Sequence, residues 1–196
     1  MSLSAAIGKM KVSVVSYNSH WPRMFEAEAE KIKEIYAGNL VDIFHIGSTS
    51  VPGLAAKPVI DIMPVVKDIS AVNELDNAFV ALGYECMGEF GITGRRYYRK
   101  GGDDRTHQIH SFGIDSRQDI IRHLAMRDYL IAFKNEAHKY AELKISLAAA
   151  FPFDIEGYCD GKDAFVKETE SKAVAWFYDS GRLRFYGSIN RAWQLY

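Results

Sequence analysis

Apolar side chains recur at helical spacing soon after Pro22, the first proline of the chain. This stripe predicts an amphipathic helix, with Pro22 in its first turn and Asn18 or Ser19 as its N-terminal cap. Gly38 is expected to end the helix. The stripe consists of Phe25, Ile32, Ile35 and Tyr36.

Runs rich in Val, Ile, Tyr and Phe predict a β-sheet in the middle of the chain. A helix over residues 68–82, stopped by Gly83, is expected to interrupt these runs, and the segment GGDDR at 101–105 predicts a tight turn. The expected strands cover residues 41–46, 59–66, 84–90, 96–100 and 106–113.

Helical spacing returns after Asp115 and predicts helices over residues 120–133, 140–148 and 165–177, with a break at Pro152. This order predicts an α+β fold, in which one short mixed sheet has helices on one side and a helical C-terminal extension. The aromatic and basic residues 181–196 fit a short hairpin, a tail docked on the body, or a contact for another subunit.

Composition narrows the class of protein. The chain has 196 residues, of which 48% are hydrophobic and 25% charged, as expected for one folded domain, here over residues 12–180 with 181–196 as a tail. The net charge of −1 argues against a general nucleic-acid coat or a polybasic membrane anchor. A nucleic-acid or membrane partner is therefore not expected, whereas a homo-oligomer remains compatible with the sequence.

No apolar run reaches the roughly 20 residues that a membrane span needs, and residues 1–18 lack the order of a signal peptide. The two cysteines, Cys86 and Cys159, belong to no CxxC or Cys/His cluster, and each is expected to be a buried reduced thiol. These features favour a cytoplasmic protein.

One polar segment stands between two apolar strands, and it contains Gly47, Ser48, Thr49 and Ser50. Glycine allows a sharp turn and a close approach to a ligand, and hydroxyl and backbone N–H groups bind phosphate oxygens. Asp61 on the following strand is expected to hold a divalent ion such as Mg²⁺ against that phosphate. The segment lacks the Gly-Lys-Ser/Thr ending of a Walker loop.

The segment GSTSVPGLAAKP at residues 47–58, with a hydrophobic pair and Asp61 after it, resembles the signature of the GrpB-like family. That family belongs to the nucleotidyltransferase superfamily, which includes the β-type DNA polymerases. Further matching segments are residues 21–32, GITGRRYYRK at 91–100, RTHQIH at 105–110, RDYL at 127–130, Tyr140 with Leu143-Lys144, and Tyr158 with Lys162. The resemblance implies a nucleotidyltransferase-like core and nucleotide or phosphate binding.

The sequence departs from an active transferase of that superfamily at one position. Such enzymes carry two carboxylates on alternate residues of a strand, which share one face, but Met63 stands where the second acid is expected. A thioether is a poor Mg²⁺ ligand. Asp61 and His110 are therefore the expected catalytic and metal-binding residues, and Mg²⁺ or Mn²⁺ the expected ion.

Basic residues near this segment are candidate phosphate ligands. Lys57 is expected either to neutralise a phosphate or to pair with Asp61, and Arg96 and Arg99 are the candidates from the basic hairpin after Gly94. His107 and His110 are three residues apart on a strand, so they face opposite sides and only His110 is expected at the site.

Three functions fit these features, and the third is a phosphodiester or phosphoanhydride hydrolase that uses the same residues. The first is a nucleotidyltransferase-like protein that binds a nucleotide or another phosphorylated small molecule at Asp61 and residues 47–50. The second is a catalytically silent accessory or regulatory module, because the resemblance extends to domains that are appended to dephospho-CoA kinases, and because Met63 replaces an acid.

Overall fold

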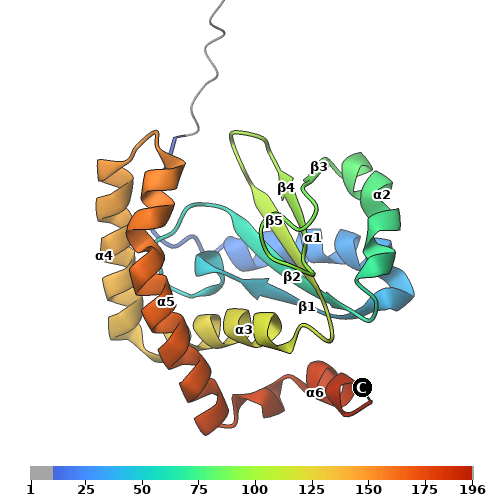
Figure 1. Cartoon of the computed structure of the whole chain (residues 1–196). Coiled ribbons are helices and arrows are strands. Elements are labelled where there is room, and N and C mark those ends of the chain that lie inside the picture. Colours follow the sequence, from blue (N-terminus) through green and yellow to red (C-terminus); the bar gives the residue numbers. More distant parts are fainter. Residues whose placement is uncertain (1–10, 196) are drawn as a thin grey trace, which may run out of the picture.

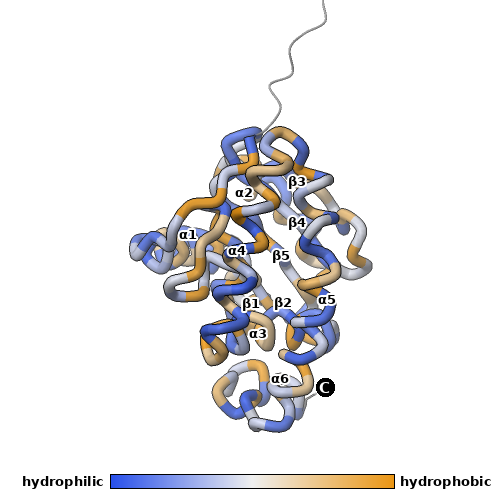
Figure 2. The backbone as a smooth tube through the Cα atoms, turned by 90° about the vertical axis from the view of Figure 1, so that its left-hand side faces the viewer, coloured by the Kyte–Doolittle hydropathy of each residue, from blue (hydrophilic) through white to orange (hydrophobic). Residues whose placement is uncertain are grey.

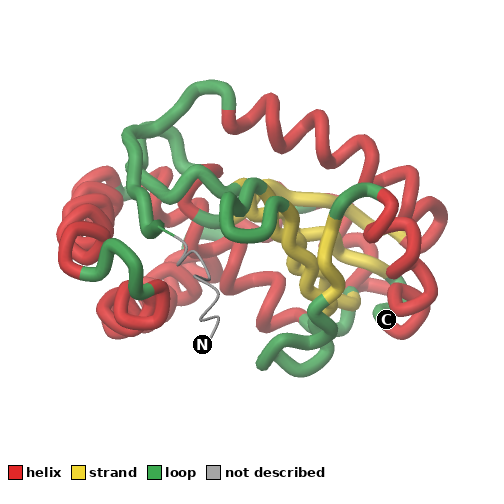
Figure 3. The backbone as a smooth tube through the Cα atoms, turned by 90° about the horizontal axis from the view of Figure 1, so that it is seen from above, coloured by secondary structure: helices red, strands yellow, loops and turns green. Residues whose placement is uncertain are grey.

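A five-stranded mixed sheet lies between helices in the computed structural model, which describes residues 11–195 (Figures 1 and 3). Its strands are β1 (Leu40–Ile46), β2 (Ile60–Val66), β3 (Tyr84–Cys86), β4 (Arg96–Lys100) and β5 (His107–Gly113). They lie in the order β1-β2-β5-β4-β3. The pair β2–β5 is parallel and the other three pairs are antiparallel. The predicted α+β class with a short mixed sheet is confirmed.

Six α-helices surround this sheet in the part of the chain described. They are α1 (Trp21–Tyr36), α2 (Asp76–Ala81), α3 (Arg117–Ala132), α4 (Lys134–Ala150), α5 (Ile155–Asp179) and α6 (Gly187–Leu195). Within residues 11–195, none of the helices combines the length and the apolar character that crossing a bilayer requires.

The interior strand β2 buries both of its faces, because apolar residues occupy consecutive positions along it and so point to both sides of the sheet. Ile60 and Ile62 pack with α1 and α2, whereas Met63 and Val65 pack with α3, α5 and α6. Helices therefore cover both sides of the sheet, which corrects the expectation of helices on one side only. Figure 3 shows the strands between the two helical layers.

The helices α4 and α5 stand at one end of the sheet, side by side in Figure 1 and in front of β1, β2 and β5 in Figure 2. A separate apolar cluster holds them there. It joins the loop after β1, through Val51 and Leu54, to Leu130 of α3, Tyr140 of α4 and Phe165 of α5. This packing brings the two helices next to the segment 47–50.

Several predicted elements change in length. The helix expected over 68–82 is a 3₁₀ helix, Ser70–Leu75, followed by α2, and the strand expected over 84–90 ends at Cys86. Backbone hydrogen bonds to Tyr97 continue through Met87 and Gly88, and the positive φ of Gly88 then ends the extended conformation. The last predicted helix is longer, since α5 begins at Ile155, where the Asp154 side chain caps it by accepting from the Gly157 N–H.

Both cysteines are free thiols, but only Cys86 is partly buried. Cys159 is exposed, so the prediction of a buried thiol is wrong at that position. Tyr158 takes the buried place in this turn of α5, and the next residue along a helix points about 100° away.

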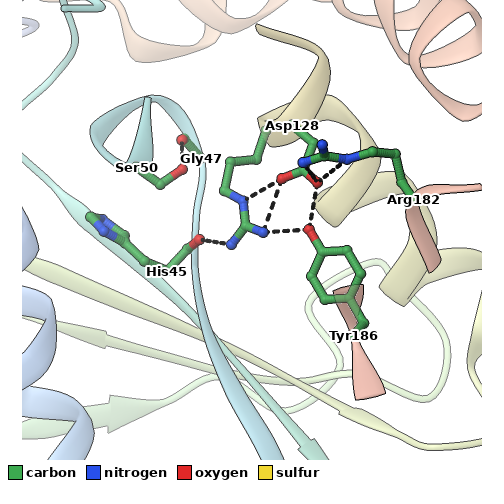
Figure 4. Close-up of polar contacts among 7 residues, drawn as sticks. His45, Gly47, Ser50, Asp128, Arg182 and Tyr186 are labelled. Carbon is green, nitrogen blue, oxygen red and sulfur yellow. Dashed lines mark hydrogen bonds and ion pairs between the residues drawn. The ribbon is translucent and has the colours of Figure 1, made fainter. Parts of the chain in front are cut away.

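The C-terminal residues dock on the body as a 3₁₀ turn (Arg182–Phe185) and α6, and not as the hairpin that was one of the alternatives. Asp128 of α3 is 3% exposed and accepts hydrogen bonds from Arg182 and from the Tyr186 hydroxyl, as Figure 4 shows. The Trp193 indole N–H donates to the Ile114 carbonyl over 2.7 Å. A buried carboxylate thus ties residues 182–193 to α3.

We expect Asp128→Asn to lower the free energy of unfolding by about 3 kcal/mol, because it leaves two buried arginine contacts without their negative partner. Glu30→Gln is the matched control, since Glu30 pairs with Lys33 at the surface and its loss costs at most about 0.5 kcal/mol. Urea unfolding measures both. Equal stabilities of the two variants would contradict the structural role of Asp128.

Candidate functional site

A cavity of about 320 Å³ opens where the end of β1 and the start of β2 and β5 meet the helices α3, α4 and α5. Segment 47–49, the strand residue Asp61 and the three helices all contribute to its lining. Its polar lining residues are Ser48, Thr49, Lys57, Asp61, Gln108, His110, Arg122, His123, Arg127, Tyr140, Lys144, Tyr158, Lys162 and Glu170. Residues far apart in the sequence therefore form one polar site.

Gly47 allows the wall of this cavity to form. Its φ is +69°, and a Cβ atom at this position would collide with the Asp61 carboxylate. The register explains the contact, because Ile46 pairs with Asp61 across β1 and β2, so the chain turns directly over that side chain. The expected meeting of the Gly-Ser turn with Asp61 is present in the structure.

Only one of the three predicted hydroxyl groups is presented to the cavity. The Ser48 hydroxyl lines it and accepts from the Lys144 ammonium over 2.9 Å. The Thr49 hydroxyl is used internally, since it donates to the Val59 carbonyl and contacts the His45 ring nitrogen. The Ser50 hydroxyl donates to the Gly47 carbonyl, and Ser50 does not line the cavity. Ser48 is therefore the available hydroxyl.

Asp61 and His110 form a pair with a defined tautomer. The His110 Nε2 lies 3.4 Å from Asp61 Oδ1, and its Nδ1 lies 3.3 Å from the Arg95 guanidinium. Arginine only donates, so Nδ1 accepts from Arg95 and the ring proton sits on Nε2, directed at Asp61. His110 thus supports the Asp61 carboxylate, and Arg95 orients His110.

The side chains at this site do not fit a divalent metal ion. Both ring nitrogens of His110 are engaged, and Met63, on the same face as Asp61, is fully buried in the core below. Among residues 11–195, no group of three His, Cys, Asp or Glu side chains is placed to hold a metal. Asp61 is a single carboxylate where a metal pair needs several.

The other side of the cavity carries three lysines. Among residues 11–195, no carboxylate oxygen lies within 4.0 Å of the ammonium nitrogen of Lys57, Lys144 or Lys162. Each instead lies over a tyrosine ring. The distances from ammonium to ring centroid are 5.4 Å for Lys57 and 5.5 Å for Lys162, both on Tyr158, and 4.4 Å for Lys144 on Tyr140.

Lys144 is the most buried of these lysines, with 2% of the residue exposed. Burial, with a smaller contribution from the positive charge of Lys162, lowers the pKa of its ammonium to about 7. Burial likewise lowers the pKa of Lys57, again with a contribution from Lys162. Lys57 and Lys144 are therefore desolvated, and both lie within reach of the positive charge of Lys162.

The two arginines of the cavity are neutralised by their neighbours. Arg122 pairs with Asp119 and Glu170, and Arg127 pairs with Asp128 and donates to the His45 carbonyl. Burial lowers the pKa of His45 to about 4, and its ring stacks on Phe25 at 4.9 Å between centroids. His45 and Arg127 therefore serve the packing of the turn.

Two predicted phosphate ligands lie outside the cavity. Arg99 pairs with Glu85 on the neighbouring strand at 2.8 Å, and Arg96 donates to the Asn73 side chain. The two arginines lie on opposite faces of β4, where Asn73 engages Arg96 and Glu85 of β3 engages Arg99. Lys57 lines the cavity but does not pair with Asp61. His107 lies on the opposite face of β5 from His110, as predicted.

The sequence prediction did not include Lys144 or Lys162. Both follow a tyrosine by four residues, in the pairs Tyr140–Lys144 and Tyr158–Lys162. On a helix this spacing places the ring and the ammonium on one face. The repeated Tyr-x-x-x-Lys spacing was the available signal, and it gains meaning only when α4 and α5 lie together.

Fold and site together define a mixed α+β protein with a lysine-rich polar cavity at the β1–β2 turn. The family model described as GrpB protein matches residues 11–172, and the chain belongs to the GrpB family. The protein YqkA of Bacillus subtilis is 44% identical over 181 residues, which cover 92% of this chain and 52% of YqkA. The chain thus spans about half the length of that relative.

A solved structure supports the fold. The crystal structure of the conserved protein GrpB from Enterococcus faecalis has a TM-score of 0.83 and 46% identity, and the match covers 85% of this chain and 99% of that one.

A dephospho-CoA kinase of Mycolicibacterium paratuberculosis is 24% identical over 89% of this chain and 49% of its own length.

The Cid1 poly(U) polymerase is a more distant structural neighbour. Its TM-score is 0.42 at 11% identity, and the match covers 67% of this chain and 45% of that chain. This likeness is too low to assign a reaction or a ligand to the GrpB chain.

We expect Lys144→Met to raise the free energy of unfolding by at least about 1 kcal/mol at pH 6–7, because it removes a desolvated charge without a carboxylate partner. The pKa of Lys144 in the folded protein lies below the pKa of a lysine in the unfolded chain. The penalty is therefore complete below pH 7 and fades as pH rises toward about 10.

Thermal unfolding at several pH values measures this effect, with Lys139→Met on the exposed side of α4 as the control. The control is expected to change stability by less than about 0.5 kcal/mol at every pH. A Lys144→Met protein that is no more stable than the control would show that Lys144 is not desolvated.

Proposed function

We propose that this GrpB protein binds a nucleotide or another phosphorylated small molecule in the cavity at the β1–β2 turn. One observation carries the proposal: the Ser48 hydroxyl, the Asp61 carboxylate and three lysines without carboxylate partners line the same cavity. An anion with further polar groups complements such a surface. The phosphate faces Ser48 and the lysines, away from Asp61.

Asp61 has a different role from the one expected from the sequence. With the His110 Nε2 3.4 Å from its Oδ1, the carboxylate is held as an acceptor at the edge of the cavity. It accepts a hydrogen bond from a hydroxyl or amino group of the ligand. Because Asp61 repels phosphate, it also orients the ligand along the cavity.

Binding without turnover is the second part of the proposal, and Met63 favours it. Met63 occupies the strand position of a second acid and is fully buried, so no rotation of its neighbours brings a second carboxylate to Asp61. One relative is named dephospho-CoA kinase and matches over about half its length. An accessory or regulatory module that senses a phosphorylated ligand accounts for both features.

Nucleotide binding is tested by calorimetry and thermal shift with nucleoside mono-, di- and triphosphates. Ser48→Ala removes a direct hydrogen bond and is expected to weaken binding about 10-fold, which is about 1.4 kcal/mol. Ser50→Ala is the matched control on the same turn, because its hydroxyl is bonded to Gly47 and lies outside the cavity. Equal losses in both variants, or no shift with any ligand, would contradict the proposed site.

Turnover is tested by release of pyrophosphate from nucleoside triphosphates. We expect the wild-type protein and Asp61→Ala to show the same background rate, because a single carboxylate does not assemble a phosphoryl-transfer centre. Pyrophosphate release by the wild type alone would instead establish a transferase or hydrolase that depends on Asp61.

A further inference from the structure

The wall of the cavity opposite Asp61 is built by two similar helix turns. Tyr140 and Lys144 come from α4, Tyr158 and Lys162 come from α5, and Lys57 reaches the same region from the loop before β2. In each turn the tyrosine ring lies under an ammonium group. Three chain segments thus converge to place three ammonium groups at one end of the cavity.

We propose that Lys57, Lys144 and Lys162 form a phosphate subsite that supplies the whole counter-charge of the ligand, so that binding requires no divalent metal ion. This inference rests on the proposed function and specifies its chemistry. The ligand group is a phosphate monoester or the terminal part of a phosphoanhydride. Such groups carry about −2 charge near neutral pH and several strong acceptor oxygens.

The inference rests on which charged side chains of the cavity already have a partner of opposite charge. Arg122 and Arg127 already have carboxylate partners, whereas the three lysines have none among residues 11–195. Like charges in a desolvated region repel one another, and an anion between them removes that repulsion. A divalent cation at this end of the cavity would increase the repulsion instead.

Geometry directs the anion to the same place. The Lys144 ammonium donates to the Ser48 hydroxyl, which leaves two of its three N–H groups for a ligand. Ser48 follows the turn at Gly47, so the hydroxyl and the ammonium converge on one point of the cavity. The tyrosine rings hold the lysine chains in place and reduce the entropy lost when they bind.

Anion binding is coupled to protonation of Lys144. The groups that face it are the Ser48 hydroxyl, the Tyr140 ring on its own helix, and Lys162 on α5, and none of them is a carboxylate. A bound dianion favours the charged form, so binding takes up a proton from solution. The contribution of Lys144 to binding of the dianion is therefore complete below about pH 7 and falls as pH rises above that value.

The test is calorimetric titration of the full chain with inorganic pyrophosphate, in the presence of either EDTA or Mg²⁺. We expect affinities within twofold of each other in the two conditions. We also expect net proton uptake at pH 8, which is measured by comparing buffers of different ionisation enthalpy. Affinity that is tenfold or more higher with Mg²⁺ than with EDTA would overturn the inference.

Variants identify the subsite. Lys144→Met and Lys162→Met are each expected to weaken pyrophosphate binding at least tenfold, and Lys144→Met to abolish the proton uptake. Lys139→Met on the exposed side of α4 is expected to leave both unchanged. Since Lys162 is only partly buried, its variant tests the subsite even if the Lys144 variant repacks.

The two proposals fail in different ways. If nucleotides bind but pyrophosphate binding requires Mg²⁺, or is unaffected by the lysine variants, the metal-free subsite is wrong and the nucleotide site remains. If neither nucleotides nor pyrophosphate bind in either condition, both proposals are wrong.

Discussion

The contact between the Asp61 carboxylate and the backbone of Gly47 is the constraint on which the cavity depends. Antiparallel pairing of β1 with β2 places Asp61 directly beneath the turn, and only a residue without a Cβ at positive φ fits there. The turn then directs Ser48 toward α4, where it meets Lys144. One steric requirement thereby sets the distance between the acidic and the basic sides of the site.

Charge divides the cationic residues of the cavity into two groups. Arg127 is held by Asp128, which also accepts from Arg182 and Tyr186, so the C-terminal residues support this wall from behind (Figure 4). The Arg127 guanidinium therefore has a structural role. The lysines have no such partners, and Lys144 is buried at a cost in stability. Desolvated groups kept at such a cost are typical of binding sites.

Much of the fold can be predicted from local sequence patterns, in which the residues concerned are close together in the chain. Pro22 locates the first helix, Pro152 locates the break between two helices, and the continuous apolar run of β2 locates that strand, each within a few residues. The covering of both faces of the sheet was not predicted. It depends on where α1 and the C-terminal helices pack, and the amphipathic pattern of a helix does not specify which sheet face receives it.

The sequence by itself determined the family, the turn at residues 47–50 and Asp61 as its neighbour, because all of these lie within one short motif. Only the tertiary structure decided which polar groups share the cavity. It directed Arg96 and Arg99 to partners elsewhere and used the Thr49 hydroxyl internally. It also brought Lys144 to Ser48 and Lys162 to the same cavity. The physical reason is that a side chain's partners are chosen by packing between elements distant in the chain, which local spacing does not encode.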